Sequence, residues 1–159
     1  MNAQPRSFRD ALGQFPTGVA LVTARTPGEQ PLGLTISSFN SVSLDPPLVL
    51  FSVDRKALSL KRLLEASGFV INILAREHKH ISSAFSRPLE KDWSRINYRM
   101  NEFTAPLIND ALAHFECEHY AQHDGGDHVI VVGRVVNFSH RPSGSPLVFF
   151  RGQYRDIHP

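Results

Sequence analysis

The chain contains one cysteine among its 159 residues, and this scarcity excludes several kinds of protein. A lone Cys117 can form neither an intramolecular disulfide nor a cysteine-based zinc cage. The longest apolar stretches, such as Val129–Val132, are far shorter than the roughly 20 residues that cross a membrane as a helix. Nothing near the start combines a basic segment, an apolar run and a cleavage site, so the sequence predicts a soluble, cytoplasmic protein with no membrane association.

The chain also lacks an excess of charge of one sign. It has 17 lysines and arginines against 15 aspartates and glutamates, interleaved along the sequence, for a formal net charge of +2. A protein that follows the backbone of a nucleic acid usually carries a long basic stripe, and none is present here. We therefore expect no nucleic acid partner.

Four motifs that mark common enzyme classes are missing from the sequence. There is no G-x-G-x-x-G, no G-x-x-x-x-G-K-[ST], no G-x-S-x-G and no H-E-x-x-H. Their absence argues against dinucleotide binding by a Rossmann fold, P-loop phosphoryl transfer, hydrolysis at a nucleophile elbow and zincin chemistry. If the protein is an enzyme, we expect a bound cofactor to supply the chemistry.

Short β-branched runs separated by turn residues dominate the chain, which we interpret as one domain over residues 1–159. Clusters of glycine, proline, aspartate and serine divide these runs. The expected strands are Val19–Thr23, Leu32–Ile36, Pro47–Val53, Phe69–Leu74, Phe115–Gln122, His128–Phe138 and Pro146–Phe150. Many short strands without strand–helix–strand alternation favour an antiparallel barrel that closes on itself and leaves no exposed edge.

Helical spacing of apolar residues is limited to three short segments. Apolar side chains recur at this spacing between Phe8 and Phe15, behind Ser7 as an N-cap, and we expect this helix to cover one end of an apolar core. Two further helices are expected over residues 58–66 and 77–85. Residues 87–109, which include the only tryptophan, show no regular pattern.

Four histidines, His114, His119, His123 and His128, lie close together in the sequence. Side chains alternate between the two faces of a strand, so among consecutive histidines of this set only His119 and His123, four residues apart, would lie on the same face. No cluster of aspartate, glutamate and cysteine accompanies them, so we expect no metal site. Cys117 lies in mid-strand between two glutamates, which raise the pKa of a thiol, and a buried structural thiol is expected rather than a nucleophile.

Two segments have the residue types that hold a flat, phosphorylated ligand. Gly33–Pro47 is dense in serine and threonine, whose small side chains admit a ring edge and offer hydrogen bonds. Asp54–Ser59 places Arg55 and Lys56 at the expected start of a helix, where the cations, the N–H groups and the helix dipole favour an anion. Composition alone leaves a plain serine-rich loop and an ordinary helix N-cap as alternatives.

A series of segments, taken in chain order, carries a family resemblance. They are Phe8–Ala11, Phe15–Val19, Gly33–Pro47, Gly68–Leu74, Pro106–Leu107, Ala111–Cys117, Gly126–His128, Gly133–Val135 and Pro146–Tyr154. Together they resemble the flavin reductase-like family, the small reductase components of two-component flavin monooxygenases. The sequence departs from that family at two places: Lys91–Arg95 stands where an Asp-Arg-Phe element is common, and Ala105 replaces a glycine.

The resemblance implies a mainly β fold, an antiparallel Greek-key split β-barrel of the FMN-binding type with a few short α-helices. It also implies the residues of a flavin and nicotinamide site. Thr35, Ser37 and Ser38 would hydrogen-bond the flavin ring and ribityl chain, Ser52 and Val53 would present backbone to it, and Arg55, Lys56 and Ser59 would hold its phosphate. His128 would stand beside the nicotinamide as the catalytic histidine, with Phe149 and Tyr154 in the segment that closes that pocket.

By the same resemblance, the chain is expected to be an NAD(P)H-dependent flavin reductase that passes hydride from NADH or NADPH to FMN or FAD. A homodimer is expected, because the family builds its flavin cleft at a subunit boundary, and reduced flavin would reach a partner monooxygenase by diffusion. Two alternatives stay open. One is a split-barrel protein that carries FMN without nicotinamide turnover, and the other is a pyridoxamine-phosphate-oxidase-like enzyme, whose phosphate would also suit Arg55 and Lys56.

Overall fold

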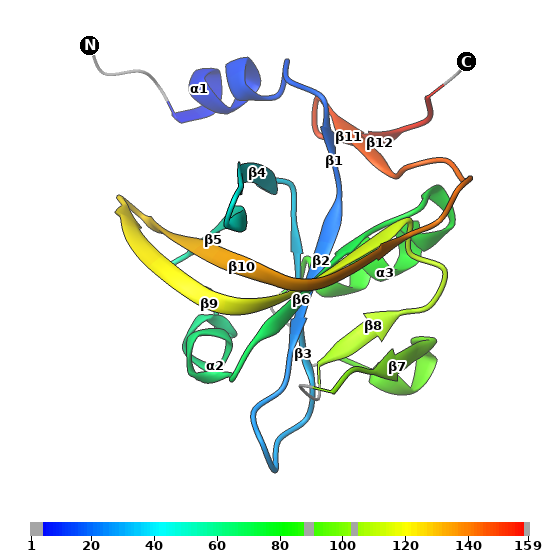
Figure 1. Ribbon diagram of the computed structural model, residues 1–159. Helices are drawn as coiled ribbons and strands as arrows, with labels where there is room; N and C mark the ends of the chain where they lie inside the picture. The colour runs from blue at the N-terminus through cyan, green and yellow to red at the C-terminus, as the bar shows by residue number, and fades with distance from the viewer. Residues whose placement is uncertain (1–4, 88–90, 103–104, 158–159) are drawn as a thin grey trace.

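β-Strands form most of the structure, a computed structural model that describes residues 5–87, 91–102 and 105–157. Its main sheet has seven strands in the order β3-β2-β6-β9-β10-β5-β4, and every neighbouring pair is antiparallel. The strands are β2 (Ala20–Ala24), β3 (Leu32–Ile36), β4 (Asn40–Leu44), β5 (Pro47–Asp54), β6 (Phe69–Ile73), β9 (Ala113–Gly125) and β10 (His128–His140). Figure 1 shows β9 and β10 as one long curved hairpin that crosses the molecule.

Smaller elements surround this sheet. A three-stranded sheet contains β1 (Thr17–Gly18), β11 (Val148–Phe150) and β12 (Gln153–Arg155), and a two-stranded sheet pairs β7 (Tyr98–Met100) with β8 (Pro106–Ile108). The helices are α1 (Pro5–Leu12), α2 (Leu60–Glu65) and α3 (Lys79–Phe85), with 3-10 turns at Arg76–His78 and Trp93–Arg95. No helix in the described ranges is both long and apolar enough to span a membrane.

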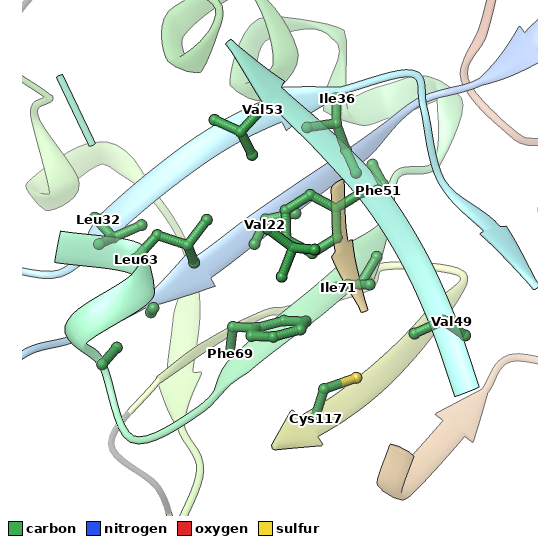
Figure 2. Packing of buried hydrophobic residues seen from close by; sticks show 14 of the residues in the cluster. Val22, Leu32, Ile36, Val49, Phe51, Val53, Leu63, Phe69, Ile71 and Cys117 are labelled. Carbon is green, nitrogen blue, oxygen red and sulfur yellow. The ribbon is translucent and has the colours of Figure 1, made fainter. Parts of the chain in front are cut away.

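The core forms on both faces of β2, whose five residues are all buried. The sequence of a strand that is covered on both faces is a continuous apolar run, without alternation of apolar and polar residues. One face carries Val22 and meets β5 and β6, where the rings of Phe51 and Phe69 lie edge to face with centroids 5.3 Å apart (Figure 2). The other face carries Leu21, which belongs to a second buried cluster with Phe85 of α3.

The prediction of a mainly β, antiparallel fold is confirmed, and each expected strand is present with its ends shifted by a few residues. Strand β4 lies inside the hydroxyl-rich segment, and β7 and β8 lie in the segment that showed no pattern. These three strands were not expected, and neither were β1 and β12. β7 and β8 have only three residues each, too few to show a pattern. β4 is a largely exposed terminal strand in which even Val42 and Leu44 are exposed, so burial does not mark it.

The N-terminal helix differs from its prediction in two ways. It begins at Pro5, so Ser7 lies within its first turn instead of capping it, and proline is well suited to that first position. The side chains of Phe8 and Leu12 are exposed, so the expectation that this helix covers an apolar core is wrong. Figure 1 shows α1 beside β1 and the β11–β12 pair, apart from the main sheet. Helical spacing identifies an apolar face but not the surface that covers it.

The site forms where β3, a terminal strand of the main sheet, approaches β5. Ser38 follows β3 directly and bridges the two strands: its Oγ accepts a hydrogen bond from the Ser52 N–H at 3.0 Å and lies 3.2 Å from the Ser52 carbonyl oxygen. Ile36 of β3 and Val53 of β5 pack in the same buried cluster beneath this point (Figure 2). The barrel is therefore open between β3 and β5, which are not paired as neighbouring strands, and the Ser38 hydroxyl connects the two strands at this opening.

Candidate functional site

Three adjoining cavities form one groove along β3. The middle cavity, about 270 Å³, lies between β3 and β5 and is lined by Thr35, Ser37, Ser38, Ser52, Val53 and His128, among others. A cavity of about 200 Å³ shares Thr35, Ile36 and Ser37 with it and adds Phe149 and Tyr154. A third, of about 530 Å³, shares Leu34, Asp54 and Ala57 with the middle one and adds Lys56 and Ser59. The groove thus brings together every predicted site residue except Arg55.

Alternation along β3 gives the groove one wall. Leu32, Leu34 and Ile36 pack into the barrel core, while Gly33 and Thr35 contact the elements around α3. A Cβ at Gly33 would lie 2.5 Å from the Phe85 ring, so only glycine lets α3 pack this close to the strand. Thr35 Oγ1 donates a hydrogen bond to the Ser82 carbonyl at 2.8 Å, which commits its proton to α3 and leaves it to act as an acceptor in the groove.

The serine hydroxyls of the groove differ in whether they already make hydrogen bonds within the chain. Ser38 is engaged with the Ser52 backbone, so this pair shapes the groove more directly than it offers hydrogen bonds. Ser37 is exposed, and its hydroxyl makes no hydrogen bond within the described chain. Ser37 is therefore the groove serine best able to bond a ligand.

Arg55 serves the β9–β10 turn in this structure, although the resemblance placed it on a phosphate. Its backbone N–H donates to the Asp127 carbonyl at 2.9 Å, its Nε donates to the Gly126 carbonyl at 2.8 Å, and its guanidinium pairs with Asp124. None of the three groove cavities has Arg55 in its lining. Of the two predicted phosphate cations, Lys56 is the one that reaches the groove.

The predicted helix start also lies further along the chain than expected. α2 begins at Leu60, and Ser59 occupies the N-cap without a side-chain capping bond. Asp54 accepts a hydrogen bond from the Lys56 N–H at 2.8 Å, which closes a tight turn after β5. Lys56 and Ser59 consequently project from a turn and a cap, and the helix that follows has only six residues.

His128 opens β10 directly opposite Asp54 of β5 and lines the middle cavity. Its Nδ1 lies 2.7 Å from Asp127 Oδ1, and because a carboxylate only accepts, Nδ1 carries the proton. This hydrogen bond holds the pKa of Asp127 below its usual value. In the neutral ring, Nε2 is then left as an acceptor, which suits a ligand that donates an N–H, such as a carboxamide.

The aromatic pair at the other end of the groove is held by α3. Phe149 and Tyr154 are register partners on β11 and β12, with ring centroids 5.6 Å apart. Tyr154 Oη lies 2.6 Å from Ser82 Oγ, and the Lys79 ammonium lies 5.5 Å from the centre of the Tyr154 ring. Ser82 therefore contacts both Thr35 and Tyr154. The sequence did not reveal this role, because it predicted only a helix over residues 77–85 and gave no sign of what that helix contacts.

The remaining candidates have structural roles. Cys117 is buried in the core, which confirms the prediction of a buried thiol. This burial raises the pKa of the thiol to about 12. His114 is buried, with Nε2 2.8 Å from the Ile108 carbonyl, and His119 lies against the Phe69 ring. In the described ranges, no three histidine, cysteine or acidic side chains are grouped as metal ligands.

Comparisons with known proteins identify the family to which the chain is similar. The family model of the flavin reductase like domain matches residues 12–158. The FMN reductase (NADH) SmoA of Agrobacterium fabrum is 44% identical over 149 residues, which are 94% of this chain and 84% of SmoA. The reductase component of the flavin-dependent trigonelline monooxygenase of Acinetobacter baylyi is 41% identical over 94% of this chain, which spans about half (48%) of that relative.

Solved structures give the same result. The NADH:FAD oxidoreductase SgcE6 of Streptomyces globisporus, in complex with NAD and FAD fragments, has a TM-score of 0.93 and 34% identity to this chain. The match covers 98% of this chain and 94% of SgcE6. A domain match over most of the sequence, a curated relative at 44% identity and the same fold in a solved structure lead to one conclusion: the chain belongs to the flavin reductase-like family.

Proposed function

We propose that the groove along β3 binds the flavin and that His128 orients the nicotinamide, so that the chain acts as an NAD(P)H-dependent flavin reductase. The observation that carries this proposal is the middle cavity, where the hydroxyl-rich end of β3, the end of β5 and His128 meet. The relatives named as NADH-dependent flavin reductases support the same reaction. When both cofactors are bound, hydride passes from nicotinamide C4 to flavin N5.

The protein's own contribution to this reaction is placement. The edge of β3 and the Ser38–Ser52 bridge give the flavin a rigid wall, and Ser37 offers a hydroxyl to it. His128 Nε2 offers an acceptor to the nicotinamide carboxamide, while Nδ1 is held by Asp127. No general base is needed, because a hydride moves between two bound rings and orientation supplies most of the advantage.

The reaction is tested by mixing the purified protein with NADH and FMN in the absence of oxygen. Rapid bleaching at the visible maximum of the flavin supports the proposal. Bound flavin that stays yellow in the presence of NADH and NADPH contradicts it and indicates a flavin carrier. The names of relatives as reductase components also support delivery of the reduced flavin to a separate monooxygenase.

Lys56 is expected to bind the flavin phosphate. Replacing Lys56 with alanine should weaken FMN binding about tenfold, the effect of losing one charge-assisted hydrogen bond of roughly 1.5 kcal/mol. Riboflavin lacks the phosphate, so its affinity should hardly change. Equilibrium dialysis with both ligands measures the difference, and Lys61→Ala, an exposed lysine outside the groove, is the matched control. Equal losses for FMN and riboflavin would remove Lys56 from the phosphate site.

The predicted homodimer is part of the same proposal. Several large apolar side chains are exposed, among them Leu44 at 95%, Leu58 at 80% and Phe15 at 76% of their full surface. Leu58 lines the 530 Å³ cavity of the groove, and Phe15 lines a further cavity that shares Ser37 and Ser38 with the middle cavity, so a second copy of the chain that covers them would also close the flavin site. We expect a dimer by light scattering at micromolar concentration; a monomer that binds flavin tightly would contradict this.

A further inference from the structure

Ser82 of α3 is a fully buried serine that makes two hydrogen bonds at the 200 Å³ cavity. Its backbone carbonyl accepts from Thr35 Oγ1 at 2.8 Å, and its hydroxyl lies 2.6 Å from Tyr154 Oη. Thr35 belongs to β3 and Tyr154 to β12, which are strands of different sheets. One residue therefore connects the strand that walls the proposed flavin groove to the aromatic pair at the end of that groove.

The hydrogen bond between the Ser82 and Tyr154 hydroxyls has one direction that leaves no buried proton unpaired. Ser82 is 0% exposed, and its hydroxyl has no other hydrogen-bond partner among the described residues. If Tyr154 donated, the Ser82 proton would be buried without an acceptor, which costs free energy, so Ser82 Oγ donates and Tyr154 Oη accepts. Tyr154 is half-buried and lines the cavity. Its own proton is therefore free to bond an acceptor within the cavity.

The helix that carries Ser82 is held firmly against β3. A Cβ at Gly33 would lie 2.5 Å from the Phe85 ring, so α3 packs closely on the strand. Ser82 and Phe85 are three residues apart and lie on the same side of this helix, where both are buried. One turn earlier, the Lys79 ammonium lies 5.5 Å from the centre of the Tyr154 ring and attracts it. The phenol is thus held at its ring by Lys79 and at its oxygen by Ser82.

Tyr154 and His128 offer opposite hydrogen-bonding groups to the groove. The cavities that they line share Thr35, Ile36 and Ser37, so the two side chains border adjoining parts of one space. His128 Nε2 is an acceptor, because Nδ1 carries the proton, whereas Tyr154 Oη, which accepts from Ser82, is a donor. A nicotinamide carboxamide has N–H groups to donate and an oxygen that accepts, so it requires partners of both kinds.

We propose that Ser82 is a positioning residue for the reductase reaction: its hydroxyl directs the Tyr154 O–H toward the carboxamide oxygen of the nicotinamide. The proposal rests on the proposed flavin reductase function. Ser82 contacts no cofactor and acts through Tyr154. Without the serine hydroxyl, the phenol proton can point to either side, and the carboxamide loses its donor for part of the time. The reacting carbon of the nicotinamide is then less well placed for hydride transfer.

The test is a double-mutant cycle of Ser82→Ala and Tyr154→Phe, measured by anaerobic reduction of FMN with NADH varied. Ser82→Ala keeps the backbone carbonyl that Thr35 uses and removes only the hydroxyl. Each single variant should lower kcat/KM for NADH about three- to tenfold, the effect of losing one hydrogen bond, and should change FMN affinity less than about twofold. The double variant should lose no more than Tyr154→Phe alone, because Ser82 acts only through the phenol.

Ser83→Ala is the matched control. Ser83 is the next serine of the same helix, and it lines none of the groove cavities. Its replacement should leave the kinetic constants for NADH and the affinity for FMN unchanged. A difference between the two serine variants would therefore report on the Tyr154 hydroxyl and not on the helix as a whole.

Three results with a protein that reduces FMN would overturn the proposal. Unchanged kinetics in Ser82→Ala would show that the hydroxyl has no part in the reaction. Losses that add in the double variant would show that Ser82 serves only the packing of α3. A fall in FMN affinity with unchanged NADH constants would place the Tyr154 phenol on the flavin instead. If the parent protein reduced no flavin with NADH or NADPH, the proposed function and this role would both fail, which is a distinct outcome.

Discussion

Replacement of His128 by alanine is expected to lower kcat/KM for the nicotinamide by about 10- to 100-fold and to leave flavin affinity nearly unchanged. The imidazole lines the middle cavity, and the hydrogen bond from Nδ1 to Asp127 leaves Nε2 to position a carboxamide. Loss of this contact misplaces the reacting carbon of the nicotinamide, and hydride transfer is sensitive to such displacement. Steady-state kinetics with NADH and flavin varied separately would show a raised KM for NADH.

The main alternative is a turn histidine whose only task is to pair with Asp127. That pair is exposed, and exposed pairs contribute little to stability, so His128→Ala should fold normally and its kinetics can be interpreted directly. His123→Ala provides a control, because His123 is exposed on the neighbouring strand β9 and lines none of the groove cavities. Unchanged nicotinamide constants in His128→Ala, or a loss confined to flavin affinity, would show that His128 has no part in nicotinamide binding.

Arg55 is the one predicted site residue that does not line the groove, and its contacts show which part of the site the sequence could not predict. Its position beside Lys56 favoured a phosphate ligand. In the structure, however, the β5–β10 register sets Asp54 opposite His128 and brings the β9–β10 turn within reach of the Arg55 guanidinium. A register between strands more than 70 residues apart is not encoded in a local segment. The result is that Arg55 supports the turn that presents His128, and of the two neighbouring cations only Lys56 lines the groove.

The strands were predictable where burial imposes a pattern, as in β2, β3 and β5, and unpredictable where it does not. β4 is largely exposed and β7 has only three residues, so neither carries enough apolar residues to stand out. Trp93 was visible as the only tryptophan, but its place in the lining of the 530 Å³ cavity depends on its packing against Phe85 of α3 and close to Gly33 of β3. Such contacts form only when α3 packs against β3 in the folded protein, so the local sequence does not show them.

Asn72 is a polar residue within the apolar run of β6, and its replacement by alanine is expected to cause the largest loss of stability. The side chain is fully buried. Its Nδ2 donates to the Leu21 carbonyl at 2.9 Å and to Thr23 Oγ1 at 3.1 Å, and its Oδ1 accepts from the Ile108 N–H at 2.8 Å. One amide thereby joins β6 to β2 and to β8.

Alanine at position 72 would leave the Ile108 N–H buried without an acceptor and would remove the side-chain hydrogen bonds to the Leu21 carbonyl and to Thr23 Oγ1. An unsatisfied buried group costs about 1–3 kcal/mol and each further lost hydrogen bond about 0.5–1.5 kcal/mol, so the free energy of unfolding should fall by roughly 3–5 kcal/mol. Urea denaturation should show a lower midpoint with an unchanged slope.

Asn137→Ala is the control: it removes an exposed amide bonded to Glu116 and should change the free energy of unfolding by less than about 0.5 kcal/mol. A loss below about 1 kcal/mol at position 72 would mean that other groups can satisfy these backbone atoms. Because none of the groove cavities includes Asn72, the variant should bind flavin normally wherever it remains folded.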